Sequence, residues 1–114
     1  MTTELSAEDA KLVTLARGAR GRVGAPEGAA VRDETGRTYS GATVALDGLG
    51  ISALRLAVAQ AAASGARGLE AAVVVGRSDV VADDDLLAVR ALGGSGVTVH
   101  LVASDGTLLA TTSS

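Results

Sequence analysis

The sequence predicts an α/β domain in which helices pack on a mixed β-sheet. Three observations predict this class: helical segments alternate with short strand-like segments, the chain has 114 residues, and 47% of them are hydrophobic. Such a length is enough for one domain and short for two, and such a composition can form a core without disulfides. We therefore expect residues 1–114 to form a single domain.

The first expected element is a helix over residues 7–20. Ser6, with Asp9 three residues later, resembles a capping box in which Asp replaces the usual Glu. Apolar residues then recur at helical spacing. These residues are Leu12, Leu15, Ala16 and Ala19. The helix is then interrupted by the breakers Gly21, Gly24 and Pro26.

A β-hairpin is expected after this helix, with strands over residues 28–33 and 37–44. The second strand alternates in polarity, and the segment Glu34-Thr35-Gly36 between the strands contains a turn-forming glycine. Residues 45–50 contain two glycines, and we expect them to form a loop.

A second helix is predicted over residues 51–64, closed by Gly65. Its only polar residues are Ser52, Arg55, Gln60 and Ser64. A helix that is apolar on nearly all sides is expected to be buried. The following run, residues 69–75, is typical of a strand buried on both faces.

The last third of the chain predicts one helix and two strands. A short helix is expected over residues 86–92, with Asp83, Asp84 and Asp85 at its positive end. The strands are expected over residues 97–103 and 108–111, and residues 112–114 are expected to be a loose tail. The order is α-β-β-α-β-α-β-β, which favours a mixed sheet covered by helices.

Composition excludes several classes of function. The chain has no cysteine, so it cannot form a disulfide framework or a thiolate zinc site. Its ten basic and thirteen acidic residues, together with a single aromatic residue, Tyr39, argue against a nucleic-acid binder. No segment has the length and hydrophobicity of a membrane span, and Glu4, Glu8 and Asp9 are unlike the basic start of a signal peptide. We expect a cytoplasmic protein.

Several short stretches stand in a characteristic order. They are Gly28-Ala29-Ala30 with Asp33-Glu34-Thr35-Gly36-Arg37, Gly41-Ala42-Thr43-Val44, Ser52-Ala53-Leu54-Arg55, Leu69–Val75 and Val97–Gly106. In order and spacing they resemble the small homo-oligomeric cytidine deaminases, over about residues 6–111. The resemblance implies a three-layer α/β/α cytidine deaminase-like fold around a mixed five-stranded sheet, and a homodimer or homotetramer.

The resemblance also implies a catalytic site that this sequence does not retain. The family holds zinc with three cysteines, or with one histidine and two cysteines, and a separate glutamate carries protons. Here the first ligand position is Ser52 and the glutamate position is Leu54. The family's PCxxC motif, which carries the remaining ligand pair, is set against Asp85, Leu86 and Val89. Without cysteine, we expect no metal, no cofactor and no catalytic residue.

Substrate contacts implied by the resemblance are missing as well. The ribose-binding motif of the family corresponds to Thr43-Val44-Ala45-Leu46, so Thr43 and Ala45 are degenerate substrate-binding positions. The aromatic wall of the family's pocket corresponds to Arg22-Val23-Gly24-Ala25, which contains no aromatic residue. Whether any small molecule binds here is left open.

Four further features have a simple structural interpretation beside a functional one. His100 is typical of a surface or half-buried strand residue rather than a metal ligand. The three consecutive aspartates favour helix capping over Mg²⁺ binding. Gly48-Leu49-Gly50 favours a plain loop over a phosphate loop, because the third glycine of that motif is Ala53. Arg17, Arg20 and Arg22 favour interaction with the helix dipole over nucleic-acid binding.

Three functional hypotheses remain. The first is a catalytically inactive cytidine deaminase-like protein with a structural or interaction role. The second is a nucleoside- or nucleotide-binding module without turnover, and the third is an atypical cytidine deaminase or another hydrolase. We also expect Leu54 to be buried where the family has its glutamate. The second helix is expected to have two apolar faces, one of which meets the sheet and the other a second subunit. The first face consists of Ile51, Leu54, Val58 and Ala62, and the second of Leu56, Ala59 and Ala63.

Overall fold

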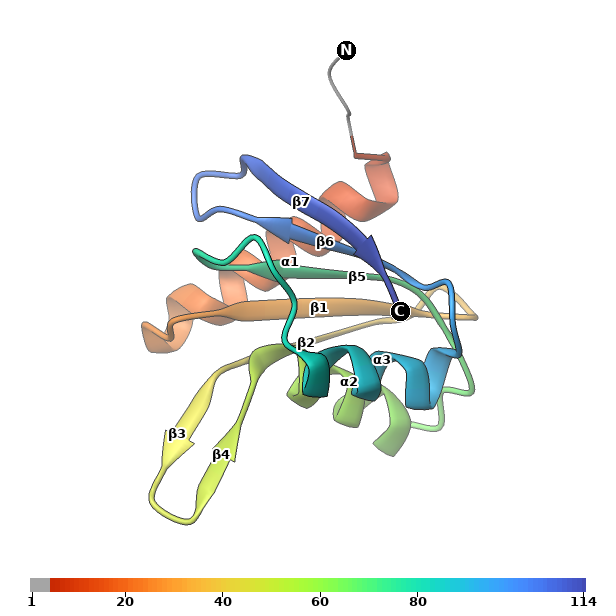
Figure 1. Ribbon diagram of the computed structural model, residues 1–114, viewed down its shortest axis with the longest axis horizontal. Coiled ribbons are helices and arrows are strands. Elements are labelled where there is room, and N and C mark those ends of the chain that lie inside the picture. Colours follow the sequence, from red (N-terminus) through yellow and green to blue (C-terminus); the bar gives the residue numbers. More distant parts are fainter. Residues whose placement is uncertain (1–4) are drawn as a thin grey trace.

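The protein forms one mixed sheet with helices on both faces, as the computed structural model of residues 5–114 shows (Figure 1). The helices are α1 (Ala7–Val23), α2 (Ala53–Ala63) and α3 (Asp83–Gly93). The strands are β1 (Gly28–Asp33), β2 (Thr38–Ala42), β3 (Val44–Leu46), β4 (Leu49–Ile51), β5 (Leu69–Val75), β6 (Thr98–Val102) and β7 (Leu108–Ser113).

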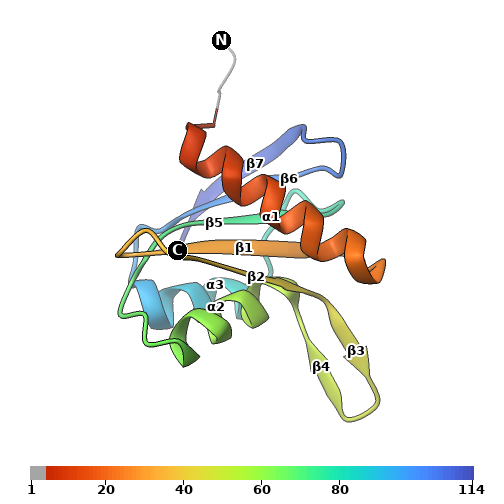
Figure 2. The ribbon, with the colours of Figure 1, turned by 180° about the vertical axis from the view of Figure 1, so that it is seen from behind.

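The main sheet has five strands in the order β2-β1-β5-β6-β7. Strands β5 and β6 run parallel, and the other neighbouring pairs run antiparallel. Helix α1 covers one face, and α2 and α3 cover the other (Figure 2). The predicted three-layer α/β/α fold with a mixed five-stranded sheet is therefore confirmed.

Two hydrophobic clusters fill the two interfaces between sheet and helices. Leu12, Val13 and Ala16 of α1 pack against one face of the sheet, which includes Val73 and Val75 of β5. The other cluster joins buried residues of α2, α3 and the opposite sheet face. Because β5 contributes to both clusters through alternating residues, its predicted burial on both faces is confirmed.

Helix α1 begins where the sequence predicts and ends later. Ser6 is the N-cap, and its side chain accepts a hydrogen bond from the Asp9 amide at 3.1 Å. The helix ends at Gly24, which adopts a left-handed φ of 64° that suits glycine. Gly21 lies inside the helix and does not break it. Leu15, predicted to lie on the apolar face, is 38% exposed, whereas Val13 is buried.

The Asp9 side chain does not reach back to close a capping box. Instead, it accepts from Arg32 Nη2 of β1 at 3.0 Å and lies 3.0 Å from His100 Nε2 of β6. Arg32 also donates to Glu70 of β5 at 2.9 Å. These contacts fix α1 against the sheet.

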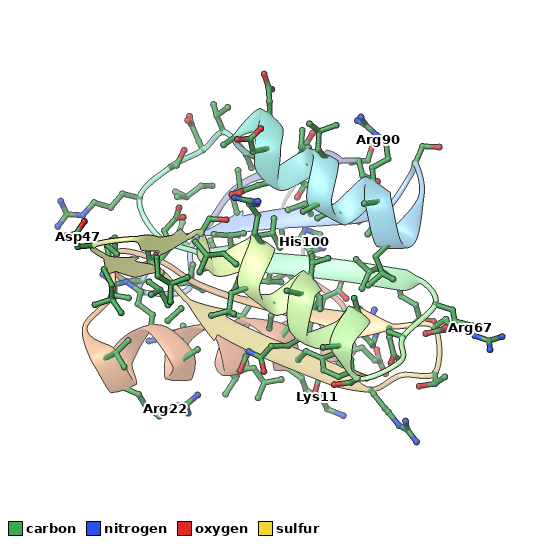
Figure 3. The ribbon with its side chains drawn as sticks, turned by 90° about the horizontal axis from the view of Figure 1, so that it is seen from below. Lys11, Arg22, Asp47, Arg67, Arg90 and His100 are labelled. Carbon is green, nitrogen blue, oxygen red and sulfur yellow. The ribbon has the colours of Figure 1, made fainter. Side chains whose placement is uncertain are left out.

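Residues 45–50 are not a loop, contrary to the prediction. Strands β3 and β4 pair there as a separate two-stranded sheet that projects from the domain (Figure 1). Asp47 lies at its tip (Figure 3). The Gly48-Leu49-Gly50 segment therefore belongs to a hairpin turn and strand β4, which argues against a phosphate loop.

The C-terminal residues are also more ordered than predicted. Strand β7 continues to Ser113, because Thr112 and Ser113 pair with Val99 and Thr98 of β6. Ser114 then accepts from the Val97 amide and donates to the Gly94 carbonyl through its hydroxyl. The expected loose tail at residues 112–114 is thus wrong.

Helix α3 includes the three aspartates in its first turn. Its N-cap is Ala82, which makes no side-chain capping bond, so the predicted capping role of Asp83–Asp85 is wrong as stated. Their negative charges still lie at the positive end of the helix. Within residues 5–114, no helix has the length and apolar character needed to cross a lipid bilayer.

Candidate functional site

The first residues of α2 and α3 meet at Ser52 and Asp85. The Ser52 hydroxyl donates a hydrogen bond to Asp85 Oδ1 at 2.6 Å. The Ser52 hydroxyl oxygen also accepts a hydrogen bond from the Arg55 amide at 3.2 Å, since Ser52 is the N-cap of α2. One hydroxyl therefore begins one helix and ties it to the next.

Glu27 lies close to this pair, just before β1. Burial, and then the negative charge of Asp85, raise the pKa of Glu27 above its usual value. Its side chain packs over Gly76, where an added methyl group would lie 2.9 Å from Glu27 Cγ. Its backbone is fixed by Thr43, whose Oγ1 accepts from the Glu27 amide at 3.2 Å. Ser52, Asp85 and Glu27 thus form a small polar cluster, with two carboxyl groups close enough to affect one another.

Leu54 fills the core directly behind Ser52. It is 0% exposed, which confirms the expected burial, and it belongs to the same hydrophobic cluster as Val81 and Val89. Leu86 packs against the edge of this cluster. Among the positions that correspond to the family's site, Ser52 and Asp85 are the two whose polar side chains bond to each other.

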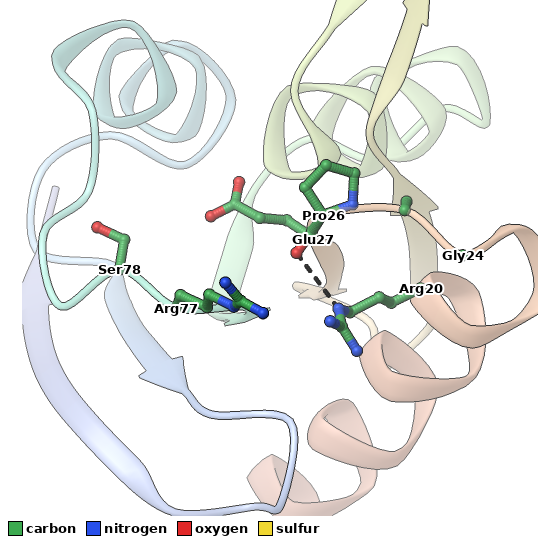
Figure 4. A pocket seen from close by; sticks show the side chains of 7 residues that line it. Arg20, Gly24, Pro26, Glu27, Arg77 and Ser78 are labelled. Atoms are coloured by element: carbon green, nitrogen blue, oxygen red, sulfur yellow. Dashed lines mark hydrogen bonds between the residues drawn. The ribbon is translucent and has the colours of Figure 1, made fainter.

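A pocket of about 490 Å³ opens beside Glu27 (Figure 4). We call it the arginine pocket, and its lining consists of Arg20, Gly24, Ala25, Pro26, Glu27, Arg77 and Ser78. Arg20 comes from the last turn of α1 and donates from Nε to the Pro26 carbonyl at 3.2 Å. Arg77 follows β5 and is exposed. The pocket therefore combines two guanidinium groups with one carboxyl group.

A second, more apolar groove of about 470 Å³ lies between the β3–β4 hairpin, α1 and α2. Thr43 and Ala45 both line it. The Thr43 side chain is occupied by the backbone of Glu27, and Ala45 offers only a methyl group. Neither position supplies a free polar group of the kind that would hold a sugar.

His100 lies on the opposite side of the sheet from this site. Its Nδ1 is 3.0 Å from Thr111 Oγ1, and its Nε2 contacts Asp9. Its side chain is 9% exposed and belongs to the interface between α1 and the sheet. His100 is therefore buried, not at the surface or half-buried as predicted, and both of its ring nitrogens contact side chains of the protein.

The chain matches one known family. The model of the cytidine deaminase-like family matches residues 5–106. The chain belongs to the cytidine deaminase-like family.

Solved structures agree with this assignment. A cytidine deaminase from Burkholderia pseudomallei has a TM-score of 0.76 and 23% identity, over 96% of this chain and 92% of the other. A cytidine deaminase from Mycobacterium leprae has a TM-score of 0.71 and 21% identity, over 91% and 95%. The enzyme from Mycobacterium tuberculosis gives 0.70 and 21%, over 91% and 92%. At such identities the likeness shows the fold alone. Among curated protein sequences, none matches significantly.

The side chains of this cytidine deaminase-like protein do not fit the zinc ion of the family. The sequence has no cysteine, and its single histidine is held on the α1 side of the sheet. Across residues 5–114, no three His, Cys, Asp or Glu side chains gather in a way that could hold a metal. Ser52 and Leu54 supply neither a thiolate nor a proton carrier, so no step of a zinc-dependent reaction can be derived.

Sequence reasoning missed Glu27 and Arg77. Both lie next to glycines at strand ends, Glu27 before Gly28 and Arg77 after Gly76. The available signal was a charged residue just before the start of β1 and another just after the end of β5. Only the antiparallel pairing of Gly28 with Val75 brings these two ends together.

Proposed function

We propose that this chain is a non-catalytic cytidine deaminase-like protein that keeps the family scaffold for a structural or interaction role. The hydrogen bond between Ser52 and Asp85 carries the proposal. In the register given by the family resemblance, Ser52 stands at the first ligand position, and Asp85 stands at the proline of the family's PCxxC motif, next to the ligand position of Leu86. A hydroxyl–carboxylate bond there joins α2 to α3 without a metal.

The buried Leu54 supports the same proposal. In the resemblance its position belongs to the glutamate that carries protons. A leucine side chain can do no acid–base chemistry, and here it is packed in the core with no exposed surface. The third hypothesis, an atypical deaminase or hydrolase, would need another nucleophile and base, and Ser52 is already committed to Asp85 and to the α2 N-cap.

Self-association is the interaction that the exposed apolar surface favours. Leu46 and Leu49 of the projecting hairpin are 66% and 56% exposed. The exposed residues of α2 include three alanines, Ala59, Ala62 and Ala63, beside the polar Arg55 and Gln60. Of the four residues predicted for one face of this helix, Leu54 and Val58 are buried, Ala62 is exposed, and Ile51 belongs to β4 rather than to α2. We propose a homodimer or homotetramer that covers this surface.

Metal analysis and an activity assay test the lack of catalysis. Purified protein is dialysed, its zinc content is measured by elemental mass spectrometry, and release of ammonia from cytidine and deoxycytidine is followed. We expect substoichiometric zinc and no release above the uncatalysed rate. A content of about one zinc per chain, or a turnover abolished by Ser52→Ala or Asp85→Asn, would refute the proposal.

A further inference from the structure

The arginine pocket holds two positive charges that the protein leaves unneutralised. Neither Arg20 nor Arg77 forms an ion pair with a carboxylate in the part of the chain that the structure describes. In Figure 4 their guanidinium groups point toward one another across the pocket. Two like charges placed in one pocket repel each other unless an anion lies between them.

The donors of this pocket are arranged for an anion. Arg20 uses Nε to bind the Pro26 carbonyl, which positions its side chain and leaves its two terminal nitrogens available. Arg77 makes no hydrogen bond from its side chain to residues 5–114 and is free to close on a ligand. Planar guanidinium groups bind phosphate and carboxylate oxygens in pairs of hydrogen bonds, and Arg is enriched where such groups are recognised.

The other polar groups of the pocket do not compete for the two arginines. The Ser78 hydroxyl donates to the Val80 carbonyl at 2.7 Å within its own turn. Glu27 packs over Gly76 and faces Asp85, whose charge, after burial, raises the pKa of Glu27. With two guanidinium groups and a single carboxylate, the pocket carries a net positive charge.

The size of the pocket indicates more than a bare ion. About 490 Å³ exceeds what a phosphate ion occupies and falls within the range of pockets for small organic ligands. We propose that the arginine pocket binds the phosphate group of a small phosphomonoester, with the organic part of the ligand extending toward Gly24 and Ala25. This inference is independent of catalysis, because the site would bind such a ligand without turning it over.

Calorimetric titration of the purified full chain tests the proposal. The probes are inorganic phosphate, cytidine monophosphate and the uncharged cytidine, each up to about 10 mM, which detects dissociation constants in the millimolar range. We expect saturable binding of cytidine monophosphate and none of cytidine. Equal affinity for inorganic phosphate would assign the site to the free ion. Tighter binding of the monophosphate would assign it to the ester.

Three variants are expected to change the affinity for cytidine monophosphate in different ways. Arg77→Ala, at an exposed position, is expected to weaken binding about tenfold or more, because a charge-assisted pair of hydrogen bonds is lost. Glu27→Gln removes the only negative charge of the pocket and is expected to tighten binding. Arg90→Ala changes the net charge of the protein equally but lies on α3, outside the pocket, and is expected to leave affinity within about twofold.

Two results would overturn the proposal. The first is no saturable binding of either phosphate probe, and the second is an equal loss of affinity in Arg77→Ala and Arg90→Ala. The ammonia assay on the same samples tests the proposed lack of catalysis separately from the proposed phosphate site. Binding with turnover would refute only that proposal, and an inactive protein that binds neither probe would refute only the phosphate site.

Discussion

Ser52 and Asp85, 33 residues apart in the chain, are joined by a 2.6 Å hydrogen bond between the starts of α2 and α3. Both groups lie at helix N-termini, where the helix dipole stabilises the Asp85 carboxylate. The same carboxylate contributes to the raised pKa of Glu27. A single hydrogen bond therefore joins the two helices, and its carboxylate also acts on Glu27 in the neighbouring pocket.

Removing this contact is expected to weaken the fold. Ser52→Ala deletes the N-cap of α2 and leaves Asp85 without its donor, so we expect a loss of about 1 to 2 kcal/mol in the free energy of unfolding. Ser52→Thr keeps the hydroxyl and is the matched control. Denaturant unfolding of Ser52→Ala, Asp85→Ala and the double variant measures the coupling. A coupling energy below about 0.5 kcal/mol would show that the bond contributes little.

Introducing a carboxylate at Leu54 is expected to be far more damaging. Leu54→Glu places an acid where nothing is exposed, and it must either carry a buried charge or raise its pKa by roughly 3 units, which costs about 4 kcal/mol at neutral pH. We expect a melting temperature lower by roughly 10 °C or more. Leu54→Met, which conserves volume, serves as the control. If Leu54→Glu melted within a degree or two of wild type, water would have to reach this position.

The lowered pKa of Asp33 is expected to make the stability of the fold depend on pH. Burial alone would raise its pKa, but hydrogen bonds from Thr35, Tyr39 and the Arg37 amide outweigh burial and lower the pKa to about 2 from 3.8. Because the folded-state pKa is depressed, Asp33 stabilises the fold above pH 3.8, and this stabilisation is lost as the pH falls toward 2.

Melting curves of Asp33→Asn against wild type measure this effect. The difference in melting temperature is expected to be largest at neutral pH and to shrink between pH 3.8 and 2. Asp47→Asn, at the exposed tip of the hairpin, changes the charge equally and is expected to show no such trend. If the melting temperatures of wild type and Asp33→Asn differed by the same amount at every pH, the depressed pKa of Asp33 would be contradicted.

Self-association is expected to depend on the hairpin. Light scattering of the wild-type chain at micromolar concentration is expected to report at least a dimer. Leu46→Ser combined with Leu49→Ser removes exposed apolar side chains and is expected to shift the mass toward the monomer. Leu87→Ser, on α3 and 55% exposed, is the control. A wild-type protein that is a clean monomer would rule out this interface.

The regular elements of this protein were determined by the sequence itself. Helical spacing in α1, the run of strong helix formers in α2 and the apolar run of β5 each predict their element, because helix propensity and the burial of apolar residues follow directly from residue order. The absence of cysteine likewise needs no structure to exclude a thiolate metal site. Leu54, apolar on an apolar helix, was recognisable as a core residue.

Tertiary structure alone decided the features that depend on pairing between distant segments. Strand β7 extends to Ser113 because β6 offers it a partner. The β3–β4 hairpin is different, because it is local and its signal, Asp47-Gly48 between two apolar runs, was present in the sequence. The Asp9 carboxylate contacts Arg32 and His100, and does not close the predicted capping box, because the sheet brings those two side chains beneath α1. Glu27 and Arg77 meet because β1 and β5 pair antiparallel, and no local pattern encodes which strand ends become neighbours.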